Sequence, residues 1–406
     1  MVFFAVLGAQ ACLSGTDLVT PPAQPPTTIT LIFRSDSEDA ATAAALGWQN
    51  GIARPEVTII PDDTTQLPRV LQASDSGRLL LQQVSGSYKI NAERWLTDSE
   101  RALLTPGDDA VGFIARGEVN SATATDHLNV EMVASRRHGI VISEWKGDDM
   151  FTAAEGTYSF SGYVRLYNNG DTTVYLDGLI IGSGLASQFD YPNYPCSMFA
   201  PYALDPRGIW ARYFHQLPGG GTDYPLLPGA TVVLATDAID HRPLYPRGLD
   251  LRGANFEFYA AASDVDNPDV PNAVDIGVEP FPSGHGLSWT LLGAVAWVAR
   301  PFDPATMQRQ LLGDGRVWAR VPANTLLDVF TKKSTYKAEY PECARLVDAS
   351  FDRREVQLLG ASLEDYFLAY RRRELPISMD GRPVLQHTRT SAWDVVVAPM
   401  TPFAKP

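Results

Sequence analysis

Short runs of β-branched and aromatic residues, separated by turn-forming residues, place the tightest limit on what this chain can fold into. From Thr28 onward such runs recur at roughly ten-residue intervals and end at Gly, Pro, Asn or Asp. Residues 57–60, 79–81 and 88–92 are examples. This spacing is typical of antiparallel β-sandwiches. The chain is therefore predicted to be all-β, with long loops and a few short helices.

Two short helices are expected between the strands. Thr97 and Glu100 have the spacing of a capping box and precede residues that favour a helix. The other helix is expected at residues 362–373, where a serine would cap the N-terminus and three consecutive arginines would lie at the negative C-terminal end.

One turn signal predicts a specific pairing of strands. Asn169-Gly170 lies between the alternating runs 162–167 and 173–180. Asn-Gly favours the tight turn of a two-stranded hairpin. The two runs are therefore expected to pair with each other.

Length and charge set the organisation and exclude one class of partner. A chain of 406 residues is too long for one compact core, so we assign residues 29–136 to a first β-sandwich, Ig-like in type, and 137–406 to a second. An apolar content of 45% with 20% charged residues indicates folded domains rather than disorder. The net charge of −14 repels phosphate backbones, so no nucleic-acid partner is expected.

The first residues resemble the end of a bacterial lipoprotein signal. An apolar run at 2–7 leads into small residues and then Cys12, after which the chain becomes polar. Residues 1–12 would form the signal segment, Cys12 would carry the lipid, and 13–28 would form an extended proline-rich tether. We therefore expect lipid anchoring at the cell outer membrane, with the periplasmic or surface face left open. The alternative is a buried N-terminal strand.

Residues 55–92 carry a recognisable series of motifs. A Val-x-Ile strand at 57–59 and a Gly turn at 76–77 are followed by a Leu-rich strand, and Gly-x-Tyr-x-Ile-x-Ala occupies 86–92. This series resembles the carboxypeptidase-regulatory-like β-sandwich. The resemblance implies a spacer domain without an active site.

The second domain carries a longer series. Residues 140–144 and 163–179 resemble the core motifs of the lamin-tail β-sandwich. Three further motifs, at 227–241, 250–259 and 264–272, follow the order seen in the family catalogued as domain of unknown function 4876. The resemblance to that family implies a lamin-tail-like sandwich on an envelope lipoprotein, often beside an outer-membrane transporter. It supplies no catalytic residues.

An acidic cluster is the candidate metal site. Asp264, Asp266, Asn267 and Asp269 place four oxygen-bearing side chains within six residues, and hard cations such as Ca²⁺ prefer oxygen ligands. The alternative is a set of Asx-turns, in which these side chains bind their own backbone. A structural calcium ion is thus one of two interpretations, and no other cofactor is expected.

An aromatic-rich segment, residues 189–224, is the candidate binding surface. Long loops without periodicity are uncommon in compact domains and are usually functional when ordered. Tyr and Trp supply rigid contact area for a partner. The candidate residues are Tyr191, Tyr194, Tyr202, Trp210 and Tyr213. The alternative is that these rings form a small core beneath the loop.

The remaining reactive residue types give weaker signals. Cys196 and Cys343 would form a disulfide in an oxidising envelope compartment if they lie close together, and otherwise remain two free thiols. His241 is expected to anchor a loop by hydrogen bonding rather than to bind a metal. The surroundings of Ser283 are better explained by a glycine-rich turn than by a catalytic nucleophile. The glycine triplet at 219–221 is likewise better explained by a turn than by a phosphate-binding loop.

These observations favour a protein without enzymatic activity. The expected function is that of a cell-envelope lipoprotein, acting as an accessory or recognition component of an outer-membrane transporter or surface complex. The alternative is a surface protein that binds a glycan or another ligand with its aromatic loop.

Overall fold

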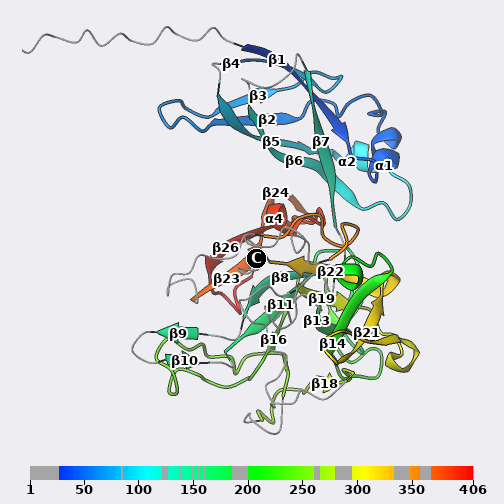
Figure 1. The fold of residues 1–406 in the computed structure, drawn as a ribbon, viewed down its shortest axis with the longest axis vertical. Coiled ribbons are helices and arrows are strands. Elements are labelled where there is room, and N and C mark those ends of the chain that lie inside the picture. The colour runs from blue at the N-terminus through cyan, green and yellow to red at the C-terminus, as the bar shows by residue number, and fades with distance from the viewer. Residues whose placement is uncertain are drawn as a thin grey trace, which may run out of the picture.

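The computed structural model describes residues 27–83, 86–120, 127–137, 139–147, 150–152, 156–158, 161–184, 200–259, 266–278, 295–332, 347–356 and 367–405. The predicted all-β class is confirmed, because strands dominate every part of this structure. The strands form two bodies, which Figure 1 shows one above the other. Strands β1 to β7 make the first domain, and the strands from β8 onward make the second.

The first domain is a single path of seven strands bent around one core. The order is β3-β2-β5-β6-β7-β1-β4. Strand β7 changes partner along its length, pairing with β1 in parallel up to Met132 and with β6 antiparallel from Val133. This change encloses a core in which Leu31, Phe33 and Ile90 are fully buried. The strands are β1 (Thr27–Ser35), β2 (Glu56–Pro61), β3 (Arg69–Gln72), β4 (Arg78–Gln83), β5 (Ser87–Trp95), β6 (Ala110–Asn120) and β7 (His127–Arg136).

Two short helices accompany the first domain. Helix α2 (Asp98–Arg101) is the predicted one, and its capping box is confirmed: Thr97 Oγ1 accepts from Glu100 N at 3.3 Å, and Glu100 Oε2 accepts from Thr97 N at 2.8 Å. Helix α1 (Ala40–Ala45) was not predicted, and it follows Asp39 directly. The alanine-rich sequence favours this helix.

The second domain packs two sheets against each other. One sheet has the order β17-β16-β11-β8-β23-β26, and the other has the order β20-β21-β14-β13-β19-β22 with β18 added to β14. Their shared core holds Trp145 from the first sheet and Phe330 from the second, with ring centroids 4.7 Å apart.

The bounds of the strands of the second domain are β8 (Ile140–Lys146), β9 (Met150–Thr152), β10 (Gly156–Tyr158), β11 (Tyr163–Asn168), β12 (Val174–Tyr175), β13 (Ile180–Gly184), β14 (Gly208–Gln216), β15 (Pro225–Leu226), β16 (Thr231–Ala235), β17 (Phe256–Glu257), β18 (Val274–Asp275), β19 (Val295–Ala299), β20 (Gln308–Leu311), β21 (Val317–Pro322), β22 (Leu326–Thr331), β23 (Leu368–Arg372), β24 (Glu374–Met379), β25 (Arg382–Leu385) and β26 (Val395–Pro399). The helices are α3 (Ala200–Ala203), η3 (Pro304–Thr306), η4 (Ala323–Thr325) and α4 (Ser391–Asp394).

The predicted Asn-Gly hairpin is wrong. Strand β11 pairs with β8 and β16, whereas β12 pairs with β15. The turn itself forms, but Asn168 Nδ2 donates to the carbonyl oxygens of Thr172 and Leu226, at 2.8 Å each, and so holds the chain against β15. A turn residue sets a local bend, and the pairing partner was decided by packing elsewhere.

The predicted helix at 362–373 is also wrong over the part that the structure describes. Leu368–Arg372 is strand β23, which pairs with β8 and β26. Ala369 and Tyr370 are buried against the two neighbouring strands. Burial inside a sheet overrode the local helix signal here.

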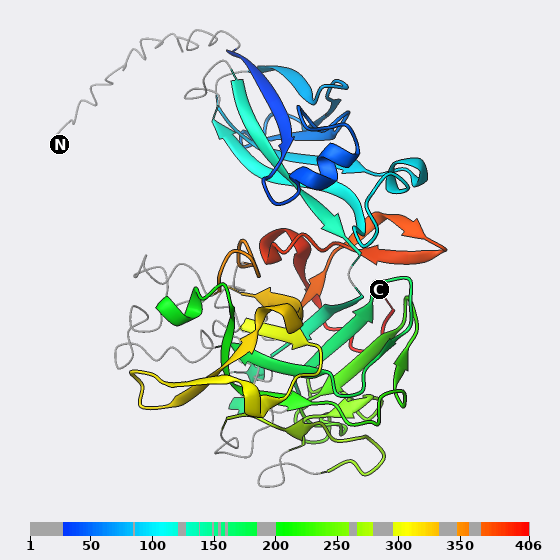
Figure 2. The same cartoon turned by 90° about the vertical axis from the view of Figure 1, so that its right-hand side faces the viewer.

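The two domains are joined by a short connection and a hairpin. Only residues 137–139 separate β7 from β8. The β24–β25 hairpin of the second domain lies beneath the first domain, as Figure 2 shows. Its Leu375 and Val384 are buried against Val111 and Ile114 of β6. Among the described residues, no helix is long and apolar enough to cross a membrane.

Candidate functional site

The junction between the domains is the most elaborate polar region of the described structure. Arg353 of the second domain binds Asp36 and Glu38 of the first, and Arg389 reaches the same Glu38. The distance from Arg353 Nη2 to Glu38 Oε2 is 2.8 Å. Burial and the neighbouring Asp39 raise the pKa of Asp36, and Arg353 opposes that rise. The end of β1 is thereby fixed to the second domain.

Backbone contacts reinforce these ion pairs. Arg136 N donates to the carbonyl oxygen of His387 at 3.0 Å, and His387 N donates to Ser135 Oγ at 3.2 Å. Each partly exposed ion pair contributes about 0–1 kcal/mol. Burying one large apolar side chain, as the hairpin does with Leu375, contributes roughly 1.5–3 kcal/mol. Apolar contact therefore supplies most of the stability of the junction, and the polar contacts fix its geometry.

A cavity of about 480 Å³ lies at this junction. The first domain contributes Asp39 and Arg136 to its lining, and the second contributes Asp328 and His387. Most of these charges already have partners: Arg136 Nη1 lies 2.6 Å from Asp39 Oδ1, and His387 Nε2 lies 3.2 Å from Asp328 Oδ1. Charged groups of the two domains therefore line one cavity, and several of them bind each other.

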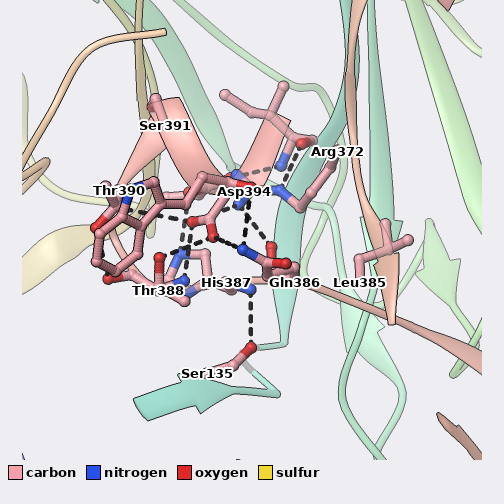
Figure 3. Close-up of polar contacts among 12 residues, drawn as sticks. Ser135, Arg372, Leu385, Gln386, His387, Thr388, Thr390, Ser391 and Asp394 are labelled. Atoms are coloured by element: carbon pink, nitrogen blue, oxygen red, sulfur yellow. Dashed lines mark hydrogen bonds and ion pairs between the residues drawn. The ribbon is translucent and has the colours of Figure 1, made fainter. Parts of the chain in front are cut away.

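A buried charge network lies behind the cavity, and Figure 3 shows its part around Asp394. Arg372 Nη2 binds Asp328 Oδ2 at 2.7 Å, and its Nη1 lies 3.4 Å from Asp394 Oδ2. Asp394 also accepts from Thr388 N at 2.8 Å and from Gln386 Nε2 at 3.0 Å. All five residues are at most 5% exposed. The network fixes the segment 386–388, which contacts the first domain.

The electrostatics of this network follow from its burial. Burial alone would raise the pKa of Asp328, but the charge of Arg372 and the hydrogen bond from His387 hold it below its ordinary value. Asp352, next to Arg353, behaves in the opposite way. Burial raises the pKa of Asp352 to about 7, although the hydroxyls of Ser391 and Thr331 donate to its carboxylate.

The predicted binding surface is wrong for Trp210 and Tyr213. Their exposed fractions are 2% and 7%, because β14 runs through the middle of its sheet. Trp210 packs beside Trp318 and edge-on against Tyr202 at 5.4 Å between ring centroids. Tyr213 lies in the main core of the second domain. The small core given as the alternative holds Trp210 and half-buried Tyr202. Tyr191 and Tyr194 lie outside the described residues.

The described members of the acidic cluster form turns. Asn267 Oδ1 accepts from Asp269 N at 3.1 Å, and Asn267 Nδ2 donates to the carbonyl oxygen of Ala238 at 2.7 Å. Asp266 Oδ1 accepts from Asn272 Nδ2 at 2.8 Å. The bond from Asp269 N to Asn267 Oδ1 is that of an Asx-turn, the alternative interpretation of this cluster. Within the ranges that the structure describes, no group of three or more His, Cys, Asp or Glu side chains could hold a metal ion.

The calcium ion stays a prediction, since Asp264 lies outside the described residues, as do Cys12, Cys196 and Cys343. His241 anchors a loop as predicted: its Nε2 lies 3.0 Å from the carbonyl oxygen of Asp237, and burial lowers its pKa.

The glycine triplet at 219–221 forms a turn. The carboxylate of Asp177 accepts from the backbone N–H groups of Gly221, Asp223 and Tyr224 at 2.8–2.9 Å. A Cβ on Gly219, whose φ is +125°, would lie 2.2 Å from Asp177 Oδ1. Glycine is therefore required where the turn closes over this carboxylate.

The junction residues were missed by sequence reasoning. Arg372 was assigned to the end of a predicted helix, and Asp328 was given no role. An isolated charged residue within an apolar strand is the one local signal that could have marked Asp328, between Leu327 and Val329. Its partner lies 44 residues away, which no local pattern reveals.

Comparisons with known proteins agree with this architecture. The family model described as "Protein of unknown function (DUF4876)" matches residues 227–285. No curated protein matches the chain. A solved structure of a DUF4876 family protein from Bacteroides thetaiotaomicron is 18% identical, with a TM-score of 0.52, and the match covers 93% of this chain and 96% of that one.

A DUF3823 family protein from Parabacteroides merdae matches with 8% identity over 76% of this chain and 100% of that one, at a TM-score of only 0.18. That value is too low to carry an argument about the fold. The comparisons and the motifs therefore agree on one family: the chain resembles the DUF4876 family in sequence over residues 227–285 and in fold along most of its length.

Proposed function

We propose that this chain is a non-enzymatic lipoprotein of the cell envelope, in which the first domain is a rigid spacer and the second a recognition body. Its partner would be an outer-membrane transporter or another surface complex. The observation that supports this proposal is the junction, where ion pairs, backbone hydrogen bonds and two buried side chains of the β24–β25 hairpin fix the two domains to each other.

The direction of the first strand supports a spacer role. Strand β1 begins at the end of the first domain that faces away from the second domain, as Figures 1 and 2 show. It runs nine residues, about 30 Å, toward the junction, where Asp36 and Glu38 contact the second domain. A lipid on Cys12 would then hold the first domain near the membrane and the second domain away from it.

The junction cavity supports a role without chemistry. Catalytic groups need a reactive atom that is open to a substrate. In the cavity, Asp39, Arg136, Asp328 and Arg389 each bind other residues of the chain. The proposal therefore places recognition on the surface of the second domain rather than in this cavity.

Mass spectrometry of the protein extracted from membranes tests the anchor. We expect a diacylglycerol-modified Cys12 at the new N-terminus and loss of membrane association in Cys12→Ser.

Cross-linking followed by detergent extraction then tests the partner, and a β-barrel protein should co-purify with the wild type. An unmodified Cys12 in soluble protein would refute the proposal.

The alternative, glycan or ligand binding through the aromatic segment, loses support. Trp210 and Tyr213 are buried, so neither ring is available for stacking on a sugar. Among the candidate residues that the structure describes, only Tyr202 remains partly exposed.

A further inference from the structure

We propose that a second cavity between the domains binds an organic oxyanion, a ligand that carries a carboxylate, sulfate or phosphate group on an apolar or sugar ring. We call this cavity the arginine groove and define it by Glu93, Trp95, Arg116, Arg373, Leu375 and Gln386. The inference goes beyond the proposed function, which requires no small ligand.

The arginine groove has a wall from each domain. Its volume is about 300 Å³. Trp95 and Arg116 come from the paired strands β5 and β6 of the first domain. Arg373 lies between β23 and β24 of the second domain, two residues before Leu375, a buried residue of the β24–β25 hairpin. The groove therefore exists only because the junction holds the two domains together.

Two arginines line the groove with unused donors. The Nε atoms of Arg116 and Arg373 are both buried, and neither has a hydrogen-bond partner within the described structure. Nearly all buried N–H groups in folded proteins are hydrogen-bonded, because leaving one unpaired costs free energy. An oxyanion in the groove would accept from the guanidinium groups of these two arginines, and guanidinium groups bind such anions through two donors at once.

The charges in the groove leave one cation without an ion pair. Arg116 Nη2 lies 3.5 Å from Glu93 Oε1, whereas Arg373 makes no ion pair within 4.0 Å among the residues described. Burial and the charge of Arg116 lower the pKa of Arg373, against the attraction of Asp394 and Glu93. The carboxylate of Asp394 is already bound by Arg372 and by Thr388.

One further acid lines the groove. Glu374 is exposed at the start of β24 and makes no ion pair with Arg373 in the part of the chain that the structure describes. Arg116 and Arg373 carry like charges and line one groove, and among the described residues Glu93 forms an ion pair with Arg116 but not with Arg373. A bound oxyanion would therefore offset the repulsion that remains between the two arginines.

The backbone holds both arginines in place before any ligand binds. Arg373 N donates to the carbonyl oxygen of Asp394 at 2.7 Å, and Arg373 O accepts from Gln386 N at 2.8 Å. Arg116 is fixed by its pairing with Asn91 in the sheet. Groups fixed in advance lose less entropy when a ligand binds.

The remaining lining indicates an organic ligand rather than a bare ion. Trp95 and Leu375 present apolar surface beside the two arginines. Trp95 keeps its place because Gly112 lies opposite it; a Cβ there would meet the Trp95 ring at 2.5 Å. An aromatic face beside a cation suits a sugar acid or a sugar ester.

The test uses the full chain without its lipid, in isothermal titration calorimetry and thermal melting. The probes are glucuronate, glucose 6-sulfate and glucose 6-phosphate, with glucose as the neutral control. We expect saturable binding of at least one anionic probe and none of glucose. Arg373→Gln and Arg116→Gln should each weaken binding at least tenfold, whereas Arg54→Gln, an exposed arginine paired with Asp75, should leave it unchanged.

The unliganded melting temperature separates a binding role from a structural one. Because Arg373 is a cation without an ion pair beside another cation, Arg373→Gln should melt at the same temperature as the wild type or higher. A clearly lower melting temperature would make Arg373 a structural residue and overturn the inference. Binding of no probe, or equal binding by wild type and Arg373→Gln, would overturn it as well.

Discussion

Replacing Arg372 with methionine removes the cation at the centre of the buried charge network while keeping a side chain of similar length. The guanidinium donates to the carbonyl oxygens of Ile142 and Gln386 at 2.9 and 3.1 Å, and it binds both Asp328 and Asp394. In the variant, two carboxylates would remain in a site closed to water.

The size of the effect follows from burial. The side chains of Arg372 and Asp328 are 2% and 1% exposed, and breaking a buried pair by removing one partner costs about 3–5 kcal/mol. The pair of Arg54 and Asp75 is 64% and 83% exposed, so Arg54→Met should cost only about 0–1 kcal/mol. A domain of ordinary stability has about 5–15 kcal/mol in total, so the first variant should be clearly weakened.

The free energy of unfolding of both variants is measured in urea, with tryptophan fluorescence and circular dichroism as the two probes. Two probes are needed because two domains can unfold in separate steps. Asp328 has a lowered pKa in the folded state, so the stability it contributes is present at neutral pH and is lost as the pH falls through that pKa. The gap between wild type and Arg372→Met should therefore shrink on acidification. A gap below 1 kcal/mol at neutral pH, or one that widens in acid, would refute the reasoning.

Three further perturbations probe the core, the junction and the titrating carboxyl. Trp210→Ala should lower the unfolding free energy of the second domain by about 3–5 kcal/mol, seen as a lower melting temperature, because its ring is 2% exposed. Leu375→Ala should cost about 2–5 kcal/mol and split calorimetric unfolding into two transitions, because the hairpin couples the domains; one unchanged transition would count against that coupling. The pKa of Asp352 is raised to about 7, so its stabilisation is full below pH about 4 and lost as the pH rises through about 7. Between pH 5 and 8, the melting temperature of Asp352→Asn should therefore rise relative to that of the wild type as the pH increases. A difference in melting temperature that stays constant with pH would contradict the assignment.

Sequence patterns correctly predicted the elements that depend only on residues close together in the chain. The capping box of Thr97 and Glu100 formed as expected, since both partners lie within one turn. Strands such as β2 and β5 were predicted from short β-branched or aromatic runs bounded by turn residues, and alternate residues of each are buried on the core. Helix α1 was missed, although alanine favours helices, because its segment follows a strand with no recognised cap.

Site predictions failed where burial decided the outcome. Aromatic composition does not distinguish a recognition surface from a core, and Trp210 lies in a core because β14 is a central strand. The Asn169-Gly170 turn likewise gave the bend but not the partner of β11. In both cases the sequence fixes a residue's neighbours along the chain, and packing fixes its neighbours in space.

The all-β class, the position of many strands and the likeness to one family were determined by the sequence alone, because periodicity and ordered motifs repeat over short distances. Which charges meet was decided by the tertiary structure. Arg353 and Asp36 lie 317 residues apart in the chain, and Arg116 faces Arg373 across a domain boundary. Such contacts depend on how two finished sandwiches pack together, which no short stretch of sequence encodes.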